Sequence, residues 1–252
     1  NLFINAGYRG FFRSEDNGDT WQDINTIDNL HPHHVISMSI DSFGNVFAVS
    51  TMHGWAPGAS WGLFRSTNHG ETWVEATNDL ETEYMTIKDV AVNNGDTIFV
   101  SVYNFKIYMS SNNGINWVET GNGFKFPSTP HILQINNFGT IFVGTYLDAV
   151  YKSTDNGNNW IYTSGFPNHT RVTSIATTNG DSVYAIANDN QSSSLNKLYK
   201  SIDNGNNWTY LIDIPEPLAN DMIVDTLGII FVANNDGIIA SYHNGNDWTT
   251  TI

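Results

Sequence analysis

The sequence contains no cysteine, which excludes a disulfide framework and a cysteine-based zinc site. It is also poor in charge, since 14% of its residues are charged, compared with about 25% in typical proteins. The 10 Lys and Arg residues are outnumbered by 25 Asp and Glu residues, and the formal net charge is −15. Because there is no basic stripe to neutralise phosphates, we expect no nucleic-acid partner.

Long hydrophobic runs are absent as well. The longest apolar runs, such as residues 227–233, have the length of a strand and fall far short of the ~20 residues that a transmembrane helix needs. No membrane insertion is therefore expected. The sequence begins at Asn1 without Met and without an apolar signal region, so we expect a mature product or a piece of a larger chain or assembly.

One eight-residue segment is present six times, and each copy begins with Ser, carries Gly at its fifth position and ends with Trp. The closing Trp residues lie at positions 21, 73, 117, 160, 208 and 248, so successive copies are 52, 44, 43, 48 and 40 residues apart. This spacing is typical of four-stranded propeller blades. The copies are residues 14–21, 66–73, 110–117, 153–160, 201–208 and 241–248.

Short runs of β-branched and aromatic residues surround every copy, and no segment has a convincing 3.6-residue apolar period. One run directly precedes each copy, as at 62–65, and two more, joined by a Gly or Asn turn, lie upstream, as at 35–40 and 46–50. We predict an all-β fold, a single-domain β-propeller of four-stranded antiparallel blades. The blades are expected at residues 1–24, 35–77, 87–120, 131–163, 172–212 and 219–252.

The first blade is expected to be incomplete at its N-terminal side. The run that begins at Leu2 corresponds to the second strand of the other blades, and no run after Ile252 is present to supply the inner one. An upstream segment or another subunit could complete the blade.

Each position of the repeated turn has a local role. The Ser hydroxyl can bond backbone N–H groups, Asp or Asn at the third position can cap the turn, and Gly can adopt a positive φ, while Trp covers the hairpin. This pattern resembles the Asp-box, or BNR, repeat of sialidase-like β-propellers. The sixth copy departs from it, because His243 occupies the third position, and its turn is expected to be looser.

Similar repeats occur in sialidases, xyloglucan-degrading glycosidases, sortilin-type receptors and photosystem assembly factors, so the resemblance indicates the fold and leaves the function open. Sialidases clamp their substrate with three Arg residues. This chain has four, of which Arg13 and Arg65 directly precede box Ser residues, leaving only Arg9 and Arg171. Sialidase activity is therefore not expected. Xyloglucan-active relatives use two propellers, and this chain supplies one.

Ligand-binding residues are expected in the loops on the face opposite the Asp-box turns. The two Trp residues outside the boxes, Trp55 and Trp61, share the loop 52–61 with His53, and exposed aromatic planes suit stacking on a sugar or anchoring a peptide. The competing interpretation is that such aromatics cap the core between blades. The ligand-binding candidates are Trp55, Trp61, His53, Tyr103, Phe105 and Tyr146, with Phe124, Phe126 and Phe166 as companions.

Histidines cluster at His31, His33 and His34, but no acidic residue is fixed beside them. We therefore expect no metal site and no cofactor.

A glycoside hydrolase needs two carboxylates, and inner strands aligned on their turns place Asp89 and Asp221 at equivalent positions near the channel mouth. Ser37, Ile132 and Ser174 occupy the same position in other blades. Asp89 and Asp221 are the catalytic candidates if the chain is a hydrolase. The competing interpretation is that such carboxylates are solvated or cap local turns. Further loop candidates are Glu81, Glu83, Asp148, Asp189 and Asp236.

The sequence favours a non-catalytic, secreted or cell-surface propeller that binds a glycan or a protein partner. The first alternative is a glycoside hydrolase, or one propeller of a two-propeller glycosidase. The second is an architectural repeat module of a larger adhesin or filament.

Overall fold

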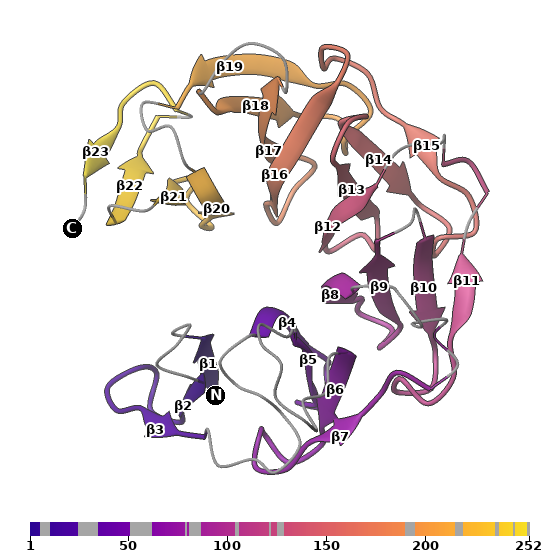
Figure 1. The fold of residues 1–252 in the computed structure, drawn as a ribbon. Coiled ribbons are helices and arrows are strands. Elements are labelled where there is room, and N and C mark those ends of the chain that lie inside the picture. Colours follow the sequence, from indigo (N-terminus) through magenta and orange to yellow (C-terminus); the bar gives the residue numbers. More distant parts are fainter. Residues whose placement is uncertain are drawn as a thin grey trace, which may run out of the picture. The chain divides into compact units, whose positions relative to one another are not determined.

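A computed structural model provides the structure of the chain. It describes residues 1–5, 11–24, 35–50, 62–78, 80, 87–103, 106–120, 122–124, 129–189, 195–214, 219–234, 237–243 and 245–250. These residues form antiparallel strands and turns, and no helix among them could cross a bilayer. The strands make six separate sheets (Figure 1), so the prediction of an all-β propeller with six blades is confirmed.

The chain divides into two compact units, and the first, Asn1–Glu119, contains three sheets. Among the residues that the structure describes, the first sheet has three strands and each of the others has four, in agreement with the predicted incomplete first blade. The strands are β1 (Leu2–Asn5), β2 (Phe11–Ser14) and β3 (Gln22–Asp23); β4 (Val35–Ile40), β5 (Val46–Ser50), β6 (Gly62–Ser66) and β7 (Val74–Glu75); and β8 (Ile87–Val92), β9 (Ile98–Val102), β10 (Lys106–Ser110) and β11 (Val118–Thr120), whose last residue opens the second unit.

The second unit, Thr120–Ile252, contains three four-stranded sheets. Its strands are β12 (Pro130–Ile135), β13 (Ile141–Thr145), β14 (Val150–Ser153) and β15 (Ile161–Tyr162); β16 (Thr170–Thr177), β17 (Val183–Asp189), β18 (Lys197–Ser201) and β19 (Thr209–Asp213); and β20 (Ala219–Val224), β21 (Ile230–Asn234), β22 (Gly237–Ser241) and β23 (Thr249–Thr250).

The second strand of the four-stranded sheets carries the core. All residues of β5, β9 and β13 are buried, whereas the short outer strands β7 and β15 are exposed. Both faces of the second strands are covered, which explains why they read as continuous apolar runs in the sequence rather than as alternating ones.

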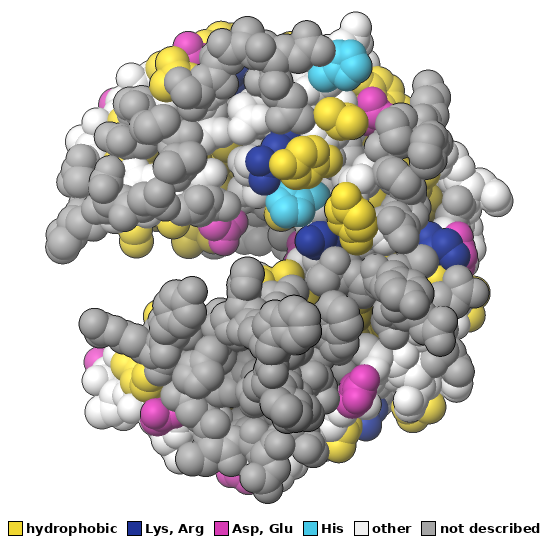
Figure 2. Space-filling model, viewed as in Figure 1, with side chains coloured by type: hydrophobic (Ala, Val, Ile, Leu, Met, Phe, Trp, Pro, Cys, Tyr) yellow, Lys and Arg dark blue, Asp and Glu magenta, His cyan; other side chains and the backbone are white. Residues whose placement is uncertain are grey.

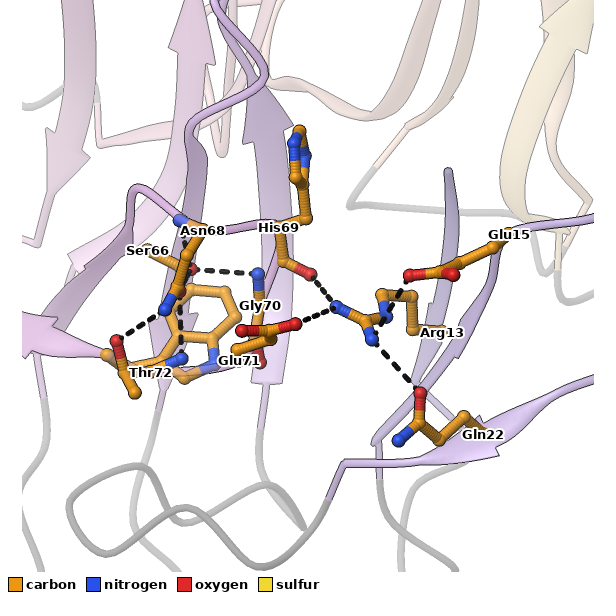
Figure 3. Close-up of polar contacts among 10 residues, drawn as sticks. Arg13, Glu15, Gln22, Ser66, Asn68, His69, Gly70, Glu71 and Thr72 are labelled. Atoms are coloured by element: carbon orange, nitrogen blue, oxygen red, sulfur yellow. Dashed lines mark hydrogen bonds and ion pairs between the residues drawn. The ribbon is translucent and has the colours of Figure 1, made fainter.

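The Asp-box turns have the bonds that the sequence predicts (Figure 3). In the second copy, Ser66 Oγ accepts a bond from the Gly70 amide at 2.8 Å and donates to Asn68 Oδ1 at 2.9 Å. The Thr72 amide then donates to Asn68 Oδ1 at 2.9 Å. The fourth residue, His69, has a φ of 56°, so two successive residues adopt positive φ before the chain turns back.

The sixth turn is closed by a different carboxylate. Gly245 N still donates to Ser241 Oγ at 2.7 Å, but Ser241 donates to Asp247 Oδ1, and His243 Nδ1 lies 2.6 Å from Asp247 Oδ2. The carboxylate that closes this turn thus lies at the seventh box position rather than at the third. The sixth turn, which the sequence predicts to be looser, therefore still has a side-chain carboxylate bonded to its Ser.

In three blades the Arg or Lys that directly precedes the box Ser in sequence bonds to the neighbouring blade. The sequence did not predict this contact. Arg13 Nη1 donates to the carbonyl of His69 at 2.8 Å (Figure 3), and Arg65 does the same to Asn113 at 2.7 Å. Lys152 Nζ donates to the Asn204 carbonyl at 2.8 Å. We call this bond the inter-blade clasp. Burial lowers the pKa of Lys152, and the Asp203 carboxylate offsets part of that shift.

The lowered pKa values of the box carboxylates indicate that the stability of the fold decreases in acid. Hydrogen bonds from Thr20 lower the pKa of Asp16 to about 2, those from Asn207 lower the pKa of Asp203 to about 2, and the His243 bond does the same for Asp247. Because an unfolded Asp has a pKa of about 4, these groups stabilise the fold above that pH, and their contribution is lost as the pH falls toward 2.

We therefore expect Asp203→Asn to flatten the decline of thermal stability between about pH 4.5 and 2.5. The third box already has Asn112 at this position, with its Nδ2 bonded to Asn116 Oδ1 at 3.0 Å, so the fold should be retained. The matched control is Asp19→Asn, since the exposed Asp19 side chain takes no part in closing its turn. Equal acid profiles for wild type and Asp203→Asn would contradict this prediction.

Candidate functional site

The turn between the second and third strands lies at the opposite end of the third strand from the Asp-box turn, because the strands are antiparallel. Tyr146 directly follows β13 and opens such a turn in the second unit. Its side chain is 43% exposed. An aromatic residue is therefore displayed on the face where the sequence predicts ligand contacts.

Two cationic or ionisable side chains flank this ring. The Arg171 guanidinium, from β16, lies 4.4 Å from the Tyr146 ring centroid. The His131 ring, from β12, lies 6.2 Å away, nearly edge-on at 74°. We call Tyr146, Arg171 and His131 the Tyr146 surface. Figure 2 shows hydrophobic, Lys or Arg, and His side chains gathered on one face of the molecule.

The backbone around Tyr146 is held on both sides. Its amide donates to the Thr129 carbonyl at 3.0 Å, and Thr145 Oγ1 accepts a bond from the Asp148 amide at 2.9 Å. The Ala149 amide donates to the carbonyl of Thr170 at 3.0 Å, next to Arg171. Tyr146 and Arg171 are thus positioned by hydrogen-bonded backbone from two blades, which reduces the ordering cost of binding.

Arg171 differs in its surroundings from the clasp cations. Arg13, Arg65 and Lys152 each donate to a backbone carbonyl of the next sheet. Within the part of the chain that the structure describes, no carboxylate forms an ion pair with Arg171. On a chain of net charge −15, this is a local positive charge beside an aromatic plane.

Tyr103 occupies the equivalent position in the first unit. It directly follows β9, is 52% exposed, and has Lys88 Nζ 5.5 Å from its ring centroid. Lys88 and His131 are equivalent as well, since each follows the first residue of its inner strand. Two blades therefore carry the same pairing of an aromatic ring with a cationic or ionisable side chain.

The other predicted aromatics have different outcomes. Phe124 packs on Tyr151 and Trp160, with ring centroids at 4.7 and 5.1 Å. Phe166 packs in the same way on Tyr199 and Trp208, at 4.6 and 5.3 Å. For these two the structure shows packing between blades rather than display on a face. Residues that lie outside the described part of the chain are Trp55, Trp61, His53, Phe105, Phe126, Arg9, His31, His33 and His34.

The carboxylate candidates both lie at a β-bulge and bond to the preceding blade. Asp89 Oδ1 accepts bonds from Ser37 Oγ and from the Val90 amide, the latter at 2.9 Å. Asp221 Oδ1 accepts bonds from Ser174 Oγ at 2.9 Å and from the Met222 amide at 2.8 Å.

The predicted alignment of Ser with Asp thus appears as a hydrogen bond between neighbouring inner strands. Asp89 belongs to the first unit and Asp221 to the second, and their use as a catalytic pair stays a prediction. Three of the other carboxylate candidates lie outside the described part of the chain, namely Glu81, Glu83 and Asp236. The structure does not describe the side chain of Asp189 either.

Within the described residues, no group of three or more His, Asp or Glu side chains could hold a metal ion. The side chains that define the Tyr146 surface were only partly anticipated. Tyr146 was predicted, Arg171 remained as an unassigned Arg, and His131 had no sequence signal because its proximity to Tyr146 depends on the pairing of β12 with β13.

Comparisons with known proteins identify the repeat more closely. The family profile described as photosynthesis system II assembly factor YCF48 matches residues 31–165, more than half of the chain. No curated protein sequence matches the chain.

Several solved structures share the fold. A GH74 enzyme from Niastella koreensis superposes with a TM-score of 0.72 at 17% identity, over 95% of this chain and 42% of that one. YCF48 bound to D1 peptide gives 0.64 at 17% identity, over 86% and 66%. The extracellular domain of a hybrid two-component system from B. thetaiotaomicron gives 0.70 at 13% identity, over 96% and 31%. The chain thus spans less than two thirds of each of these proteins, and the likeness concerns the fold.

Proposed function

Because this chain belongs to the family of photosynthesis system II assembly factor YCF48, we propose that it is a non-catalytic propeller that binds a polypeptide segment of a protein partner. The binding site is the Tyr146 surface, on the face opposite the Asp-box turns. The observation that carries the proposal is the exposed Tyr146 ring with the Arg171 guanidinium 4.4 Å from its centroid.

The chemistry of this surface suits an extended peptide. Tyr and Arg dominate the binding energy of many interfaces because they bury a large planar area and offer directed hydrogen bonds. The Arg171 charge favours a segment that carries a carboxylate, and the Tyr146 ring provides a plane for an apolar side chain. A relative of the same family has been solved with a bound peptide, which supports a polypeptide rather than a glycan ligand.

We expect Tyr146→Ala and Arg171→Gln each to weaken peptide binding at least tenfold, which corresponds to about 1.4 kcal/mol or more. The probes are an array of synthetic peptides with acidic and aromatic residues and, beside it, an array of polysaccharide fragments. Affinities for the strongest peptide are then measured by titration calorimetry. The matched control is Tyr242→Ala, because Tyr242 is similarly exposed but belongs to an Asp-box turn.

Equal affinities for wild type and both variants would overturn the proposed site. Retention of polysaccharide fragments alone would favour the glycan-binding alternative. Polysaccharide hydrolysis that disappears in Asp221→Asn would favour the glycoside hydrolase.

We further propose that the protein is secreted or displayed at the cell surface. Support comes from the extracellular domain of a hybrid two-component system from B. thetaiotaomicron that shares its fold. Fractionation of the source cells, with detection only in a cytosolic fraction, would contradict this localisation.

A further inference from the structure

Asn residues that are followed by Gly are the chemically least stable Asn residues of a chain. Because Gly has no Cβ, the backbone nitrogen after the Asn can approach the side-chain carbonyl carbon closely. The chain contains eight such pairs, of which five belong to Asp-box turns. Their Asn residues are Asn17, Asn94, Asn113, Asn122, Asn156, Asn179, Asn204 and Asn244.

The fifth sheet contains one pair of each kind. Asn204 and Gly205 belong to the box turn that follows β18, whereas Asn179 and Gly180 lie in the turn between β16 and β17. Both turns belong to the second unit. The two pairs can therefore be compared within one sheet.

The pair in the box turn is held in place on both sides of the reacting bond. Asn204 Oδ1 accepts a bond from Asn136 Nδ2 at 2.7 Å, and Asn204 Nδ2 donates to Thr140 Oγ1 at 2.9 Å. The buried Gly205 amide donates to Ser201 Oγ at 2.9 Å. Reaction requires this amide to lose its proton to solvent and the side chain to turn toward it, and a buried, bonded amide opens rarely. The equivalent Gly amides of three other boxes donate to their Ser at 2.8 or 2.9 Å.

The pair in the turn between β16 and β17 is open. Asn179 and Gly180 are both exposed, and the Gly180 amide donates to Thr178 Oγ1 at 3.2 Å, at the long end of the usual range. A Cβ added at Gly180 would meet only Thr178 Oγ1, at 3.9 Å. Asn179 Oδ1 accepts a bond from Asn137 Nδ2 at 3.0 Å. A donor at this oxygen stabilises the negative charge that develops on it when the adjacent carbon is attacked.

We propose that Asn179 is a site of spontaneous deamidation in the folded protein. The Gly180 backbone nitrogen gives its proton to hydroxide and attacks Asn179 Cγ. The bond between nitrogen and Cγ forms, the bond between Cγ and Nδ2 breaks, and Nδ2 takes up a proton from water and leaves as ammonia. Water then adds to either carbonyl carbon of the cyclic imide and opens it, which leaves aspartate or isoaspartate at this position.

The modification changes a turn that is tied to the fifth box. The Asn204 amide donates to the Asp181 carbonyl at 3.0 Å, and isoaspartate lengthens the backbone two residues before Asp181 by one methylene group. The modified fraction is therefore expected to show faster hydrogen exchange at the Asn204 amide.

The test follows deamidation of the intact chain by peptide mass spectrometry in mildly alkaline buffer. We expect Asn179 to react at least about tenfold faster than Asn204 in the folded chain, because only its Gly amide is open to solvent. In guanidinium chloride the two rates are expected to become similar, since both residues then precede Gly in an unfolded chain. Gly180→Ala is expected to fold, because the added Cβ has room, and to slow the reaction at Asn179 by crowding the attacking nitrogen.

A matched variant tests the protection in the box. Ser201→Ala removes the acceptor of the Gly205 amide and is expected to speed deamidation at Asn204, with circular dichroism as the check of folding. Equal rates at Asn179 and Asn204 in the folded chain would overturn the proposal. The absence of product at Asn179 while the unfolded chain reacts there would do the same, as would a rate at Asn179 that Gly180→Ala leaves unchanged.

Discussion

Trp73→Ala is expected to lower the free energy of unfolding by about 3–5 kcal/mol, the usual cost of removing a large buried aromatic side chain. Trp73 is 3% exposed and belongs to a cluster that contains Phe11, Val46 and Phe64. Its ring centroid lies 5.9 Å from that of Phe11 in the first sheet. The substitution therefore leaves a cavity between two blades, and chemical denaturation measures its cost.

The chain offers a matched control at the same box position. Trp21 and Trp73 both donate from Nε1 to the carbonyl of their own box Gly at 3.1 Å. Trp21, however, is 41% exposed. Trp21→Ala removes the same hydrogen bond and is expected to cost only about 1–2 kcal/mol, since little cavity forms. Equal losses for the two variants would mean that the turn, rather than burial between blades, accounts for the role of the Asp-box Trp.

Gly165→Ala is expected to lower the free energy of unfolding by more than about 3 kcal/mol, because two separate effects add. Gly165 has a φ of 107°, which an L-residue rarely adopts. An added Cβ would also collide with the carbonyl group of Trp208, lying 2.8 Å from its carbon. Because the obstacle is backbone rather than a flexible side chain, one of the two segments must move.

Gly139→Ala separates these two effects. Gly139 also has a positive φ, 78°, but an added Cβ would meet nothing within 4 Å. It is expected to cost about 1–2 kcal/mol from backbone strain alone. Thermal denaturation of both variants measures the difference, and a Gly165→Ala protein as stable as Gly139→Ala would refute the close approach at Trp208.

The close approach at Gly165 repeats a feature of the preceding blade. Gly123 has a φ of 112° and lies against the backbone of Trp160, and each of the two Gly residues is followed by a Phe that packs on the same Trp. The pair Gly-Phe is present in the sequence at both places. The pair acquires its structural role only through contact with a Trp that lies 37 or 43 residues after the Gly, and no local sequence pattern shows that contact.

The candidate site also combines features that the sequence predicts with features that only contacts between blades reveal. Tyr103 and Tyr146 could be predicted as exposed aromatics because each ends a second strand, whose position follows from the turn. Phe124 and Phe166 had the same appearance in the sequence but pack on box Trp residues. Asp89 and Asp221 could be aligned with Ser37 and Ser174, while the hydrogen bonds that join each Asp to the Ser of the preceding inner strand could not be foreseen.

The sequence by itself determined the number of blades, the strands within each blade and the incomplete first blade. These properties depend on residues close together in the chain, because a hairpin turn needs its own Ser, Asp or Asn and Gly. Each strand is likewise recognised from its own β-branched and aromatic residues. Only the tertiary structure decided which aromatics are displayed and which cations form inter-blade clasps. Those properties depend on contacts between neighbouring blades, some 40 to 70 residues apart, as between Arg13 and His69, and no local pattern encodes them.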